Sequence, residues 1–63
     1  MNVGEKIRKE RLQKQIKQIE LAKKVGISNT FLSDIEKGRG RPSIDTLKKI
    51  AEALEINCSE LID

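Results

Sequence analysis

The 63-residue sequence contains no histidine, tryptophan or tyrosine and a single cysteine, Cys58. Without a second cysteine no intramolecular disulfide can form, and without histidine the common zinc ligand sets are absent. No nucleophile has a base to pair with, so the sequence predicts neither an enzyme nor a metal or cofactor site. The core must therefore come from packed apolar side chains or from oligomerisation.

Long hydrophobic runs are also missing. No stretch approaches the roughly 18 consecutive apolar residues of a membrane span, and the N-terminal residues lack the apolar segment of a signal peptide. Together with a free thiol, this predicts a cytoplasmic protein with no membrane partner. The length is that of one domain, so we expect residues 1–63 to fold as a single unit.

Aromatic residues are reduced to one, Phe31. Single-stranded nucleic acid is usually held by stacking bases on several aromatic rings, whereas a duplex bound through phosphates and groove edges needs none. Basic residues, by contrast, gather in one half. Residues 1–25 contain eight Lys or Arg and three Glu (+5), while residues 26–63 contain five basic and seven acidic residues (−2). This half suits a polyanion, although a solvated lysine surface would have the same composition.

Apolar residues recur at helical spacing along the whole chain. Asn2, Ser28, Ser43 and Asn57 stand where helix caps are expected, whereas Lys17 is a poor cap because it has no acceptor for free N–H groups. Five short helices are predicted, over residues 2–14, 18–25, 29–37, 44–54 and a last turn through Leu61 and Ile62. On the fourth helix, the residues expected to face inward are Ile44, Leu47, Ile50, Ala51 and Leu54.

Only Gly26, Ile27 and Ser28 separate the second and third helices. A link this short suits a helix-turn-helix, in which two helices cross steeply after a sharp turn. The residue after the second helix needs a positive φ, which glycine adopts without steric cost. We therefore expect Gly26 to make the turn and Ile27 to plug the core.

The segment "QIELAKKVGISNTFLSDIEKG" resembles the helix-turn-helix of the phage repressor and Cro-like family, also called the XRE family. The flanking segments "IRKERLQ" and "RPSIDTLKKIAEALEINCSELI" match the same pattern, so the resemblance covers nearly the whole chain. It implies an all-α fold, a compact five-helix lambda-repressor-like bundle. It also implies that the third helix enters the DNA major groove while the second lies across it.

The resemblance also implies which side chains meet DNA. Outward residues of the third helix would read base edges, and Phe31 would either touch thymine methyls or cover the core. Residues at the helix ends and in the "KGRGRP" loop would hold phosphates. The base-reading residues are Asn29, Thr30, Ser33 and Asp34, and the phosphate-binding residues are Lys17, Gln18, Lys37, Arg39, Arg41 and Arg11.

Two charged residues, Arg11 and Glu36, fall on apolar stripes of the first and third helices. Because a buried charge without a partner is costly, we expect them to pair, as the corresponding residues do in similar proteins. Glu55 replaces the usual glycine after the fourth helix, so either a non-glycine residue lies at positive φ there or the turn differs. The dimer surface is predicted to contain Ile56, Cys58, Leu61 and Ile62, although these residues could equally complete the monomer core.

Two functions from different classes fit these features. The first is a sequence-specific regulator of transcription, a repressor, that binds an inverted repeat in double-stranded DNA as a homodimer. The second is a protein-interaction module such as an antitoxin, or the DNA-binding part of a larger regulator. No small-molecule ligand is evident from the sequence, and the operator and the regulated genes are not encoded in it.

Overall fold

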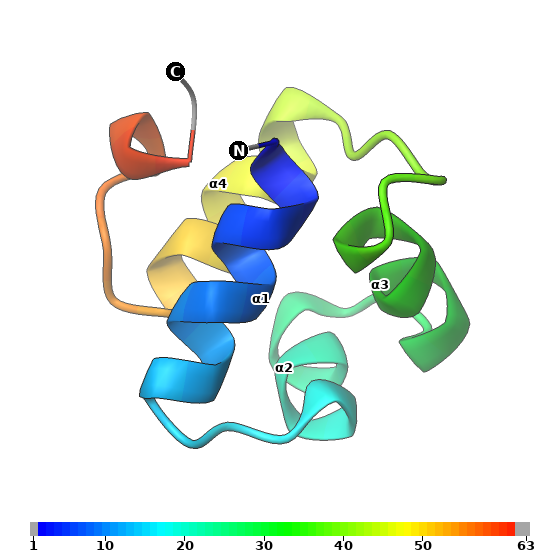
Figure 1. Cartoon of the computed structure of the whole chain (residues 1–63), viewed down its shortest axis with the longest axis horizontal. Helices are drawn as coiled ribbons and strands as arrows, with labels where there is room; N and C mark the ends of the chain where they lie inside the picture. The colour runs from blue at the N-terminus through cyan, green and yellow to red at the C-terminus, as the bar shows by residue number, and fades with distance from the viewer. Residues whose placement is uncertain (1, 62–63) are drawn as a thin grey trace.

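The computed structural model describes residues 2–61, which form four α-helices and one short 3₁₀ helix (Figure 1). The first four agree with the predicted helices to within two residues at each end. The predicted last short helix is a single 3₁₀ turn, so four α-helices and one 3₁₀ helix form the predicted all-helical fold. The elements are α1 (Val3–Gln13), α2 (Gln18–Val25), α3 (Asn29–Glu36), α4 (Ile44–Ala53) and η1 (Cys58–Glu60).

Side-chain caps begin three of the four α-helices. The side chains of Asn2, Ser28 and Ser43 each accept a hydrogen bond from the backbone N–H three residues later, at 2.9, 3.0 and 3.1 Å. Such caps satisfy N–H groups that have no partner inside the helix. Helix α2 starts differently, because the Lys17 side chain makes no cap bond and the Lys17 N–H instead donates to the Glu20 carboxylate at 3.3 Å.

Each α-helix is followed by a residue with positive φ. These residues are Gln15 (57°), Gly26 (84°), Gly38 (81°) and Glu55 (59°). In all four turns, the N–H of the next residue donates to the carbonyl five positions earlier, at 2.8–3.1 Å, which satisfies a carbonyl at the helix end. The positive φ expected at Gly26 and allowed for at Glu55 is confirmed, whereas the one at Gln15 was not foreseen.

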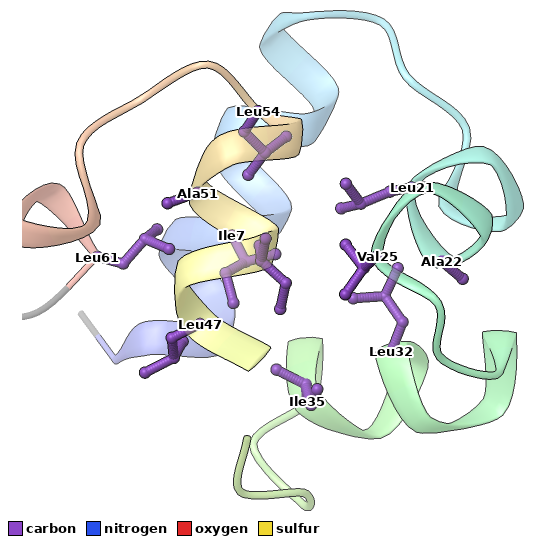
Figure 2. Packing of buried hydrophobic residues seen from close by; sticks show 11 residues of the cluster. Ile7, Leu21, Ala22, Val25, Leu32, Ile35, Leu47, Ala51, Leu54 and Leu61 are labelled. Carbon is purple, nitrogen blue, oxygen red and sulfur yellow. The ribbon is translucent and has the colours of Figure 1, made fainter. Parts of the chain in front are cut away.

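The core lies between α1, α2, α3 and α4, and η1 closes it from the other side of α4 (Figures 1 and 2). Helix α3 packs against α1 and α2, α2 also packs against α4, and η1 packs against α4. The buried apolar residues are Ile7, Leu21, Ala22, Val25, Leu32, Ile35, Leu47, Ile50, Ala51, Leu54 and Leu61.

One residue of α4 departs from the predicted pattern. Ile44, expected to face inward, is 61% exposed. As the first residue of the helix, it lies on the turn beside the loop from α3, where no other element covers it. The rest of the predicted inward face, from Leu47 to Leu54, is buried as expected.

A glycine lets α1 approach α3 closely. Gly4 is buried in the first turn of α1, and a Cβ placed on it would collide with the backbone carbonyl oxygen of Ile35 in α3. Any larger residue would therefore push α1 away from α3. This close contact fixes how near α1 lies to α3.

Candidate nucleic-acid interface

The turn between α2 and α3 has the predicted helix-turn-helix form. Gly26 follows α2 in the left-handed conformation, and no atom lies within 4 Å of a Cβ built on it, so the backbone conformation alone accounts for the glycine. Ile27 is half-buried and packs against the core. Ala22, four residues before Gly26, is buried on the inner face of α2.

A buried ion pair joins the first helix to the end of α3. Arg11 and Glu36 are 8% and 6% exposed, and the guanidinium meets the carboxylate through two parallel hydrogen bonds. Nε of Arg11 donates to Oε2 of Glu36 at 2.8 Å, and Nη2 donates to Oε1 at 3.0 Å. Such a bidentate contact is stronger than a single hydrogen bond between the same groups. The predicted pair of Arg11 and Glu36 is confirmed.

Two further bonds extend this pair into a network that also reaches α2. Nε2 of Gln18 donates to Oε1 of Glu36 at 3.3 Å, and Nη1 of Arg11 donates to the carbonyl oxygen of Ile16 at 2.9 Å. The carboxylate of Glu36 thus accepts from α1 and from the first residue of α2. The resemblance implies that Gln18 also braces the third helix, but the sequence did not identify Glu36 as its partner.

The side chains predicted to read bases lie on α3. Asn29 and Thr30 are exposed in its first turn, and Ser33 and Asp34 are half-buried one turn later. Residues four apart lie on the same helix face, so Asn29 stands above Ser33 and Thr30 above Asp34. The four side chains therefore form a polar strip along α3, whose contact with bases remains a prediction.

Phe31 lies beside this strip and is half-buried against the core. Of the two roles considered for it, this packing supports the role in covering the core. Its ring also lies near the loop between α3 and α4, since Cε1 would be 3.4 Å from a Cβ placed on Gly40.

Basic side chains stand at both ends of the helix-turn-helix. Lys17 occupies the N-cap position of α2, Lys37 occupies the C-cap position of α3, and Arg39 and Arg41 follow in the loop; all four are exposed. Arg11 is different, since it is buried and already donates three hydrogen bonds within the protein. Its predicted phosphate contact stays untested.

A hollow of about 350 Å³ lies between the start of α1, the α3–α4 loop and the inner face of α4. Its walls combine apolar side chains such as Val3 and Leu47 with glycine backbone and Arg41. The expectation that the protein takes no small-molecule ligand remains a prediction.

The predicted dimer surface is only partly available in the monomer. Leu61 is fully buried against α4, so its assignment to that surface is wrong: its side chain completes the monomer core. Ile56 and Cys58 are half-buried at the edge of the core and can still contribute to an interface. Ile62 lies outside the described residues.

Across residues 2–61, none of the helices combines the length and apolar character that crossing a bilayer requires. Within the same residues, no three acidic, cysteine or histidine side chains come together as metal ligands would.

Comparison with known proteins places this architecture. A helix-turn-helix family model matches residues 7–61. The chain is 39% identical over 62 residues to the immunity repressor of Bacillus phage phi105, covering 98% of this chain but only 43% of that repressor. Among solved structures, the P22 c2 repressor bound to a synthetic operator superposes with a TM-score of 0.93 at 32% identity, covering 100% of this chain and 96% of that one.

SinR, a regulator of biofilm formation solved in complex with DNA, superposes with a TM-score of 0.90 at 34% identity, covering 97% of this chain and 98% of that one. The family match, the relatives and the fold agree with the resemblance carried by the helix-turn-helix segment. The chain therefore belongs to the helix-turn-helix family of phage repressor and Cro-like (XRE) proteins.

Proposed function

We propose that this chain is the DNA-binding domain of a transcriptional repressor, with α3 lying in the major groove of a specific operator. The observation that carries this proposal is the way α3 is held. Its C-terminal residue Glu36 is held by buried bonds to Arg11 and by a partly buried bond to Gln18, while Asn29 and Thr30 at the start of the polar strip are exposed. A helix that is held in place on its buried side and carries polar side chains on its exposed side is suited to reading base edges.

The basic groups support the same orientation. Lys17 and Gln18 stand at the start of α2, where free N–H groups and the helix dipole favour an anion. Lys37, Arg39 and Arg41 stand at the other end of α3. Positive groups on both sides of the polar strip would hold phosphates on the two edges of the groove. The DNA-bound structures of the P22 c2 repressor and SinR support a duplex as the partner.

The proposal includes a homodimer on an inverted repeat. Helix α3 has eight residues, a length of about 12 Å, so one copy can read only a few base pairs. Two copies related by a two-fold axis would read two half-sites about one helical turn apart. Ile56 and Cys58 are the described residues that we assign to the contact between copies. Such a repressor would act in the cytoplasm.

Selection of bound sites from a random duplex library tests this function directly. We expect inverted repeats with half-site centres about 34–36 Å apart along the helix axis. If a dimer neutralises about 6–10 phosphates, log affinity should fall against log salt concentration with a slope of about −5 to −9. An unenriched library, together with affinity that does not change with salt, would refute DNA binding and favour the protein-interaction module.

A further inference from the structure

The chain folds back over α3 directly after that helix ends. Gly38 reverses it in the left-handed conformation, with its N–H donating to the carbonyl of Ile35 at 3.1 Å. The N–H groups of Arg39 and Gly40 then both donate to the carbonyl oxygen of Asp34, at 2.8 and 3.1 Å. Two consecutive N–H groups on one acceptor fix the first part of the loop to the last turn of α3.

Beyond these bonds, the loop backbone lies against the side of α3. A Cβ built on Gly40 would lie 3.4 Å from three atoms of that helix, namely Cε1 of Phe31, Cβ of Asp34 and the backbone nitrogen of Ile35. Phe31 and Asp34 are three residues apart and share a helix face. The φ of Gly40 is outside the left-handed region, so the close approach of α3, rather than the backbone conformation, limits the size of a side chain here.

The ring of Phe31 thus has two neighbours. It packs against the hydrophobic core and also lies next to Gly40, with Cε1 at 3.4 Å from a Cβ built there. Arg39 and Arg41 flank Gly40 and are exposed. The approach of Gly40 to α3 therefore fixes the backbone positions from which the Arg39 and Arg41 side chains extend, relative to the polar strip on α3.

We propose that Phe31 and Gly40 are positioning residues, which hold the α3–α4 loop against the recognition helix so that base reading and phosphate binding share one rigid frame. This inference rests on the proposed function, because it assigns Arg39 and Arg41 to DNA phosphates. It gives the single aromatic residue of the chain a role in affinity that does not require contact with DNA.

The matched variants Gly40→Ala and Gly40→Val test whether DNA binding depends on the α3–α4 loop lying against α3. An alanine Cβ at 3.4 Å makes ordinary contacts, so Gly40→Ala should keep the parent's affinity within about threefold. Valine adds two more carbons against the same face and should lift the loop. Gly40→Val should then bind operator and random duplex about tenfold or more weakly. Each lost phosphate contact should make the salt slope shallower by about 0.9.

The sequence selected from a random library should be the same for Gly40→Val as for the parent, because the variant replaces no side chain of the polar strip and leaves the bonds that hold Glu36 in place. The thermal midpoint should also stay close to that of Gly40→Ala. In a background carrying Arg39→Ala and Arg41→Ala, adding Gly40→Val should cost less than about twofold, because the groups that it displaces are already gone. Equal binding by the two Gly40 variants, or the full loss of affinity in the arginine-free background, would overturn the proposal.

Phe31→Ala and Phe31→Leu provide a second test. Phe31→Ala should lower the affinity for DNA about as much as Gly40→Val does. Phe31→Leu should recover most of that affinity, because leucine still fills the space beneath the loop. A changed base preference in Phe31→Ala would show that the ring touches bases, which contradicts a positioning role. If the double variant Arg39→Ala/Arg41→Ala keeps the parent's salt slope, these arginines do not bind phosphates and that part of the proposed function fails. This result differs from the equal binding of the two Gly40 variants, which would refute only the positioning role.

Discussion

Removing the carboxylate of Glu36 should strongly destabilise the protein, because that group compensates a buried guanidinium. Both residues are more than nine-tenths buried, so little water reaches either charge. In Glu36→Ala, the Nε and Nη2 groups of Arg11 and the Nε2 group of Gln18 lose their acceptor together.

The size of the effect follows from the burial of the pair. Breaking one partner of a buried ion pair typically costs about 3–5 kcal/mol. A domain of 63 residues has a free energy of unfolding of about 3–9 kcal/mol in total. Since 1 kcal/mol shifts the midpoint of so small a domain by about 4–8 °C, Glu36→Ala should melt at least about 12 °C below the parent.

Thermal unfolding followed by circular dichroism measures this shift. Glu52→Ala, at an exposed glutamate of α4, is the matched control and should melt within a few degrees of the parent. The double variant Arg11→Met/Glu36→Leu removes both charges and should recover most of the lost stability, because neither charge is left unpaired. If Glu36→Ala melts like Glu52→Ala, the ion pair is not buried in solution and the reasoning fails.

Three further outcomes are expected. Gly4→Ala should lower the free energy of unfolding by about 1–3 kcal/mol in urea titrations, because its Cβ collides with the carbonyl of Ile35; an unchanged midpoint would place α1 farther from α3. Glu55→Gly should raise the same free energy by about 0.5–1 kcal/mol by relieving a non-glycine residue at positive φ, and a lower value would contradict this. In competition binding, Asn29→Ala should cost about 1–3 kcal/mol on the selected operator while sparing random DNA, whereas Arg41→Ala should weaken both; the reverse result would exchange their roles.

Much of the fold was predictable because its signals are local. Cap residues at Ser28 and Ser43 and a glycine between two helices mark boundaries through interactions within a few residues. The positive φ at Gln15 carries no such signal, since glutamine is not selected for that conformation. The same holds for Gly4, whose meaning comes from a carbonyl 31 residues away in the chain.

The candidate site divides in the same way. The Arg11–Glu36 pair could be predicted because two charges on apolar stripes must find partners. The partner of Gln18 and the close approach of Gly40 to Phe31 could not be predicted from the sequence. Both depend on how separate segments of the chain meet in space. Leu61 is a case in which the sequence allowed two interpretations, because an apolar residue there fits a monomer core and a dimer interface equally well; only the structure shows that it is buried.

The burial of the Arg11–Glu36 pair separates two responses of this protein to ionic strength. Salt weakens the attraction between exposed groups and DNA phosphates, but screens a pair shielded from solvent far less. Raising the salt concentration should therefore release the duplex while α3 keeps its place in the folded domain. A titration with salt would then report the electrostatics of binding alone, and the released protein would be ready to bind again when the salt is diluted.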